Sequence, residues 1–227
     1  MFIGSAFVLF LGFPAPAVAS CPPLAPGSSW LLSAAVAPLM VRPPNGPAPL
    51  EVEIKWFTHP IRQPTRFEFD VDGDGVPEWT DTMRGNLYYP RGTHTYQRPG
   101  QFAFTVRVHH AGQVTTFSAP VKVFSPVDFD RELQTRWETM RDSLRRGDVP
   151  AALECIHSES RRRYGEIFRL LASDLPNVDK ILTKITFKEH RRESAIYEME
   201  RIDDGRTKLF DVQFEIDADG IWRVRSF

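Results

Sequence analysis

The stretch HTYQRPGQFAFTV, residues 94–106, contains a turn signal followed by a strand signal. Pro99-Gly100 marks a tight turn, because proline presets its own φ and glycine tolerates backbone conformations that other residues avoid. In the QFAFTV that follows, large apolar residues alternate with small or polar ones. Alternation with a period of two predicts a strand with one face in a core and the other in solvent. The stretch therefore predicts an antiparallel sheet.

The same pattern occurs upstream of this stretch. In LEVEIKW, residues 50–56, apolar side chains alternate with Glu and Lys. Turn signals separate the strand candidates, at PPNGP (residues 43–47), Arg91-Gly92 and Ala111-Gly112. Short strands that alternate with such turns are typical of an all-β sandwich.

Three segments together resemble the polycystic kidney disease (PKD) domain family. They are GPAPLEV (residues 46–52), the Asp/Gly turn FDVDGDG (residues 69–75) and the run at 94–106. The family's usual Trp-Asp-Phe-Gly-Asp-Gly is represented here with an extra Asp. The resemblance covers residues 35–125 and implies an immunoglobulin-like β-sandwich. It also implies a spacer, or a module that binds protein or carbohydrate. Catalysis is not expected of such domains.

The Asp/Gly turn is rich in carboxylates. Counted from Asp70 as position 1, acidic side chains stand at positions 1, 3, 5, 9 and 12, and a glycine stands at position 6. These residues are Asp70, Asp72, Asp74, Glu78 and Asp81, with Gly75. The spacing matches the oxygen ligands of a calcium loop, including the glycine that its sharp turn needs. The sequence therefore predicts a candidate calcium site.

A second interpretation of this turn stays open. Asp side chains in such turns often accept hydrogen bonds from their own backbone amides, with no ion present. The flanking segments are predicted to be strands rather than the helices of an EF-hand, and position 12 is Asp, whose arm is shorter than that of Glu. Five acidic groups in twelve residues nevertheless repel one another, and a divalent cation would remove that repulsion.

A different periodicity begins after Pro126. Apolar residues follow helical spacing at Phe129, Leu133, Trp137, Met140 and Leu144, and Gly147 marks the end of this predicted helix. Further helical stretches extend to about residue 181, and alternating strand patterns then continue to the C-terminus. Helices followed by an antiparallel meander predict an α+β domain over residues 128–227.

This second domain resembles the cone-shaped, cystatin-like fold shared by nuclear transport factor two and ketosteroid isomerase. The resemblance rests on the order of elements, on Arg146-Gly147-Asp148 and on the closing DGIWRV, residues 219–224. Its expected inward residues are Phe210, Val212, Phe214, Ile216, Trp222 and Val224. They predict a pocket for an apolar small ligand or for a hydrophobic segment of a partner protein.

The N-terminus carries export signals. An apolar run and the small residues AVA (residues 17–19) predict a signal peptide over residues 1–20, which is too short to span a membrane. VASC, residues 18–21, resembles the bacterial lipobox, in which the cysteine is lipidated and anchors the protein to the membrane. Plain secretion is the alternative, and the basic start of a signal peptide is missing because no Lys or Arg precedes Arg42. Residues 21–34 are predicted to form a Pro- and Ser-rich tether.

The composition restricts the function. A net charge of -1 argues against a nucleic-acid partner.

We expect an exported bacterial protein of the periplasm or outer membrane, either a lipoprotein or secreted, that binds other cell-envelope proteins or carbohydrate without catalysis. The alternative is a cone-fold isomerase- or hydrolase-like enzyme on a sandwich spacer. Glu189, Tyr197 and Asp211 are the polar groups that its predicted strands offer. Cys155 is predicted to be a small buried thiol on an apolar helix face.

Overall fold

The computed structural model describes residues 39–56, 65–83 and 91–227. The predicted signal peptide and the whole predicted tether, which includes Cys21, lie outside these residues. The first part of the described chain is all β. Its strands are β1 (Leu39–Arg42), β2 (Asn45–Pro47), β3 (Leu50–Trp56), β4 (Thr65–Asp70), β5 (Trp79–Met83), β6 (Arg91–Tyr96), β7 (Gly100–His110) and β8 (Gln113–Phe124).

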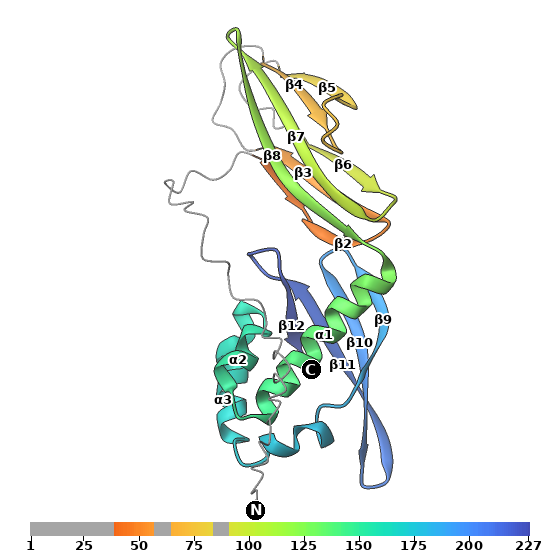
Figure 1. Ribbon diagram of the computed structural model, residues 1–227, viewed down its shortest axis with the longest axis vertical. Helices are drawn as coiled ribbons and strands as arrows, with labels where there is room; N and C mark the ends of the chain where they lie inside the picture. The colour runs from red at the N-terminus through yellow and green to blue at the C-terminus, as the bar shows by residue number, and fades with distance from the viewer. Residues whose placement is uncertain (1–38, 57–64, 84–90) are drawn as a thin grey trace, which may run out of the picture.

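These strands form two sheets, which lie in the upper half of Figure 1. One sheet has the order β1-β3-β6, and the other has the order β2-β8-β7-β4-β5. All neighbours are antiparallel except β2 and β8, which are parallel. The strand predicted from QFAFTV is the N-terminal half of β7, and it pairs with β8 along its whole length.

The inner faces of the two sheets share one core. Val52 and Ile54 come from the three-stranded sheet, and Phe67, Phe104 and Val106 come from the other; each is at most 1% exposed. Trp56 meets Phe67 edge to face, with ring centroids 5.6 Å apart. The alternation in the sequence thus corresponds to burial on one side of each strand, and the region is a β-sandwich.

The second part of the chain begins with helices. They are α1 (Pro126–Arg145), α2 (Val149–Glu154), η1 (Ser158–Ser160), α3 (Arg161–Leu170) and η2 (Leu175–Lys180). The Ser125 hydroxyl caps α1 by accepting from the Asp128 amide, and Pro126 occupies the first turn, where its missing N–H costs nothing. The side chain of Asp148 caps α2 by accepting from the Ala151 amide.

Four antiparallel strands complete this part, in the order β9-β10-β11-β12. They are β9 (Ile185–Arg191), β10 (Ser194–Asp203), β11 (Arg206–Ile216) and β12 (Trp222–Ser226). α1 lies across the sheet in Figure 1, and Trp137, Met140 and Leu144 are fully buried in the same core as Val212 and Phe214. The predicted order of helices followed by an antiparallel sheet is confirmed.

The expected inward residues of this sheet mostly fill the core. Val212, Phe214 and Val224 are 0% exposed, and Trp222 is 2% exposed. Phe210 is the exception among them, because it is only partly buried and Arg201 lies over its ring at 4.8 Å. The space beneath the helices is therefore occupied by the protein's own side chains at these positions.

The two parts join without an intervening linker. β8 ends at Phe124, and α1 begins at Pro126 (Figure 1). Asn45 on β2 makes two hydrogen bonds across the junction: its side-chain Nδ2 donates to the Gly220 carbonyl (2.7 Å), and its Oδ1 accepts from the Trp222 indole N–H (2.7 Å). Both ends of one amide side chain thus connect the sandwich to the helix-and-sheet part.

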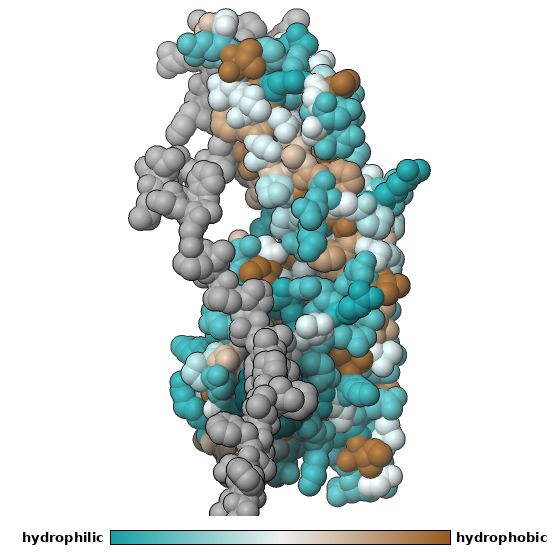
Figure 2. Space-filling model, in the orientation of Figure 1, coloured by the Kyte–Doolittle hydropathy of each residue, from teal (hydrophilic) through white to brown (hydrophobic). Residues whose placement is uncertain are grey.

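The face of the molecule that Figure 2 shows is mostly polar where it is coloured. Figure 2 shows hydrophobic side chains on one face of the molecule as separate patches within a largely hydrophilic surface. In the described part of the chain, no helix is both long enough and apolar enough to cross a membrane.

Candidate functional site

The acidic turn connects β4 to β5 at one end of the five-stranded sheet. Asp70 ends β4, and Trp79 starts β5 and pairs with Phe69. Gly73 has φ +81° and Gly75 has φ +91°, which are left-handed conformations that glycine adopts without strain. The two glycines thus explain how the chain reverses within so few residues.

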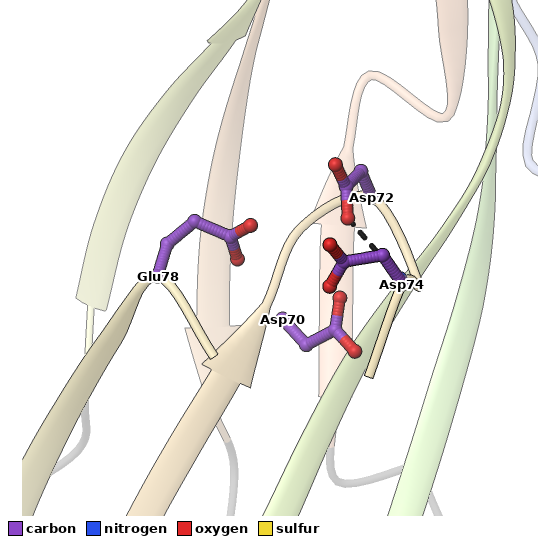
Figure 3. A group of neighbouring side chains, drawn as sticks. All are labelled: Asp70, Asp72, Asp74 and Glu78. Atoms are coloured by element: carbon purple, nitrogen blue, oxygen red, sulfur yellow. Dashed lines mark hydrogen bonds between the residues drawn. The ribbon is translucent and has the colours of Figure 1, made fainter. Parts of the chain in front are cut away.

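Four of the five predicted residues come together at this turn. One carboxylate oxygen from each of Asp70, Asp72, Asp74 and Glu78 lies within 4.8 Å of the others. Figure 3 shows the Asp70, Asp72 and Asp74 carboxyl groups gathered at the turn, while Glu78 approaches from the other side, immediately before β5. Asp70 is buried and the other three are exposed. This acidic cluster can hold a metal ion.

Asp81 is not part of the cluster. The register of β4 and β5 pairs Phe69 with Trp79 and Phe67 with Asp81, so Asp81 lies two residues further along the ladder. Two residues of a strand correspond to about 6.5 Å. The calcium-loop spacing predicted from the sequence assumes one continuous loop from Asp70 to Asp81. In the structure, the loop ends before Trp79, where β5 begins.

The cluster also accepts hydrogen bonds from its own backbone. Asp70 accepts from the amides of Gly73 (2.7 Å) and Gly75 (2.8 Å). Asp72, Asp74 and Glu78 each accept one further amide, at 3.1, 2.7 and 2.7 Å respectively. These bonds orient the carboxylates and partly offset their charge, as the interpretation without a metal requires.

A metal ion would need carboxylate oxygens that do not already accept a backbone amide. Each of the exposed side chains of Asp72, Asp74 and Glu78 uses one oxygen for an amide and has a second one. Calcium–oxygen distances of about 2.4 Å place opposite ligands about 4.8 Å apart, which is compatible with the spacing of this cluster. The donor set is all oxygen, which suits a hard divalent cation.

Other charged and aromatic groups surround the turn. The guanidinium of Arg107 donates to the Gly75 carbonyl at 2.9 Å, so a cation from β7 already contacts the turn. Burial lowers the pKa of His94, and the nearby charges of Glu78 and Asp72 oppose that shift. Burial, and then the charges of Asp72, Glu78 and Asp70, raise the pKa of Tyr96 well above its ordinary value. No sequence pattern predicted that Arg107 would reach the turn.

The candidate catalytic groups of the second part do not converge. Glu189 and Asp211 are exposed on β9 and β11. Tyr197 is fully buried on β10, and its hydroxyl donates to Asp130 Oδ1 at 2.8 Å. Burial and this hydrogen bond raise the pKa of Tyr197, which makes it a weaker acid. Among the described residues, these three groups form no acid–base pair with one another.

A buried polar network that the sequence did not reveal links β12 to the helices. Asp217 accepts from the Ser158 hydroxyl (2.7 Å) and amide (2.9 Å), and Arg223 contacts Asp217 at 3.1 Å and Asp219 at 2.7 Å. Burial alone would raise the pKa of Asp217, but the bonds from Ser158 and Ala218 and the charge of His157 lower it to about 2. The groups satisfy one another, so the network is structural.

The prediction that Cys155 is a buried free thiol is only partly correct. Cys155 is 0% exposed, as predicted, but it is disulfide-bonded rather than a free thiol. The prediction for Cys155 rested on the apolar face of its helix. Such a face indicates that a side chain is buried, but it does not indicate whether a cysteine is reduced or disulfide-bonded. The other cysteine of the sequence, Cys21, lies outside the described residues.

The comparisons with known proteins include one solved structure. The chain is similar to the solution structure of the PKD domain from human VPS10 domain-containing receptor SorCS2, with 16% sequence identity and a TM-score of 0.27. The match covers 51% of this chain and 98% of that chain. No protein-family model matches the chain, and no curated protein matches it. The resemblance of the second part to the cone fold therefore stays a prediction from the sequence.

Proposed function

We propose that this chain is an exported, non-catalytic binding and assembly protein of the bacterial cell envelope. In this proposal the PKD-like sandwich is a spacer or a protein- or carbohydrate-binding module, and the helix-and-sheet part presents the ligand or partner site. The junction is the observation that carries the proposal. β8 continues into α1 through the single residue Ser125, and Asn45 fastens the two parts together. A spacer needs such a fixed connection.

A disulfide at Cys155 is compatible with export. Disulfides persist in oxidising compartments such as the periplasm and are rare in the cytosol. Cys155 is disulfide-bonded, and the sequence begins with a predicted signal peptide. The lipid anchor at Cys21 stays a prediction of the sequence, with plain secretion as its alternative.

Calcium is the ion that we assign to the acidic cluster. A divalent cation at Asp70, Asp72, Asp74 and Glu78 would neutralise carboxylates of the β4–β5 turn and stiffen that turn. In this role the ion is structural and does not take part in a reaction. A stiffer turn suits a spacer module.

The proposal is tested by mass spectrometry of the full-length protein, purified gently from its native envelope under non-denaturing conditions. We expect a mature chain that lacks its signal peptide and retains a partner protein, a glycan or a small ligand. Recovery from the cytosolic fraction as the full precursor, with nothing bound, would contradict both export and binding. Turnover of a small molecule by the same preparation would favour the cone-fold enzyme instead.

A further inference from the structure

A hollow of about 450 Å³ lies at the junction of the two parts. The sandwich contributes Pro47, at the end of β2, and Pro49, which follows it. The helix-and-sheet part contributes the first turn of α1 and residues of β9, including Phe187. Small-molecule sites typically measure about 300–1,000 Å³ and often lie between domains. The size and the position of this hollow fit that class.

Its wall is apolar and preformed. Proline has a fixed φ, so Pro47, Pro49 and Pro126 provide a wall whose shape changes little when a ligand enters. Phe187 is 42% exposed and Val127 is 67% exposed, so apolar surface faces water on two different elements around the hollow. Covering that surface would be favourable.

One acidic side chain, Asp130, is among the described residues that line this wall. Asp130 on α1 accepts from the Tyr197 hydroxyl at Oδ1 (2.8 Å) and from the Gln134 amide at Oδ2 (2.9 Å). These two bonds hold the carboxylate in a fixed orientation. The two oxygens of a carboxylate offer about four lone-pair sites, so Asp130 retains capacity for a ligand donor.

Among the described residues, the lining of the hollow places no permanent positive charge beside Asp130. No Lys or Arg is found among the described residues that line the hollow. Burial lowers the pKa of His190, the other titratable group of the wall, which favours its neutral form. The partial positive charge at the start of α1 is met by the Ser125 cap and the Asp128 carboxylate.

We propose that this hollow binds a small apolar molecule that ends in a hydrogen-bond donor, with an ammonium group as the strongest form of that donor. The donor bonds to Asp130, and the apolar body packs against Phe187, Val127 and the prolines. This proposal deepens the binding function proposed above and rests on it. Charge-assisted hydrogen bonds are about twice as strong as neutral ones, which gives the ammonium group its advantage.

The test uses two probes of similar apolar body and opposite head group, naphthylethylamine and naphthylacetate. Each is titrated into the full-length protein and followed by the amide NMR signals of the hollow. We expect the amine to bind at least about tenfold more tightly than the carboxylate. In Asp130→Asn, which retains an acceptor for Tyr197, we expect most of that preference to disappear.

A second pair of variants separates the site from general charge effects. Val127→Lys places a cation at the rim of the hollow, whereas Leu170→Lys places the same cation on α3, where Leu170 is 84% exposed. We expect Val127→Lys to weaken amine binding by about tenfold or more, and Leu170→Lys to leave it unchanged. Both positions are exposed, so both variants should fold.

Two results would overturn the inference. Equal binding of the amine and the carboxylate, unaffected by Asp130→Asn, would show that the head group is not recognised, although the hollow would remain a binding site. Absence of any signal change at the hollow with either probe would show that it is not a site for this class of ligand. Neither result bears on whether the purified protein retains a partner from the envelope. The mass-spectrometry experiment therefore tests the proposed function separately.

Discussion

The hydroxyl of Tyr96 donates a hydrogen bond of 2.7 Å to the carbonyl of Val71, and this bond connects the two sheets of the sandwich at the acidic turn. Tyr96 ends β6 in one sheet, and Val71 directly follows β4 in the other. Tyr96 is 3% exposed and Val71 is 4% exposed. The tyrosine of the HTY motif thus fixes the start of the turn that carries the carboxylates.

Replacing Tyr96 with Phe removes this bond and keeps the ring. The buried Val71 carbonyl then lacks its partner, so we expect the free energy of unfolding to fall by about 1–3 kcal/mol. Denaturant unfolding of the two proteins measures the difference. Because the packing of the ring on Phe102, with centroids 4.5 Å apart, is retained in the variant, an unchanged midpoint would mean that the bond contributes nothing.

Calcium should stabilise the wild-type protein through the acidic cluster. At a calcium concentration about a hundred times the dissociation constant, we expect a gain of roughly 2.7 kcal/mol, provided that the unfolded chain does not bind calcium. Thermal melts in calcium and in chelator measure it. The double variant Asp72→Asn/Asp74→Asn should lose the gain, because it removes two exposed members of the cluster and leaves buried Asp70 in place.

Asp81→Asn is the matched control for this experiment. It removes one charge from the same segment, but from a residue of β5 that lies outside the cluster. We expect this variant to retain the full calcium response. Melts that coincide in calcium and in chelator for the wild-type protein would support the interpretation of the turn without a metal.

Asn45→Ala should loosen the connection between the two parts. It leaves the Trp222 indole N–H and the Gly220 carbonyl without the partner that Asn45 provides, and we expect a loss of about 1–3 kcal/mol. Glu51→Gln is the control, because the Glu51–Arg192 pair also crosses the junction but is more than half exposed on both sides. Exposed pairs contribute about 0–1 kcal/mol. Small-angle scattering should show a broader range of shapes for Asn45→Ala only.

Asp217 predicts an acid-sensitive contribution to stability. Its pKa in the folded protein is about 2, below the ordinary value of 3.8, so its ionised form favours folding. This contribution is complete above about pH 4 and is lost as the pH falls toward about 2. Asp217→Asn should unfold more easily at neutral pH, and its stability should change less with pH in this window. Parallel slopes for the two proteins would contradict the assignment.

The cysteines offer a test of export and anchoring. We expect thiol-blocking reagents to label Cys155 in the denatured protein only after reduction, because it is disulfide-bonded. A sulfur that carries a lipid thioether cannot also form a disulfide. Labelling of Cys155 without reduction, together with a lipid mass on Cys21 and release from the membrane by Cys21→Ser, would support the lipobox instead.

The sequence by itself determined the elements of this protein. Residues 94–106 and 50–56 predicted strands because alternation reports which side chains face the core, and the 4, 4, 3, 4 spacing from Phe129 to Leu144 predicted α1 for the same reason. Four of the five predicted metal ligands came together because they lie within nine residues of one another, where the turn alone sets their distances.

Only the tertiary structure decided what depends on distant contacts. Asp81 lies outside the cluster because the pairing of β5 with β4 determines its position. The spacing of acidic residues along the sequence does not report how strands pair. The Asn45 bridge joins residues 175 positions apart in the chain, and the hollow beside Asp130 is lined by both Pro47 and Phe187. Such sites arise from how the two parts pack against each other, which local periodicity does not report.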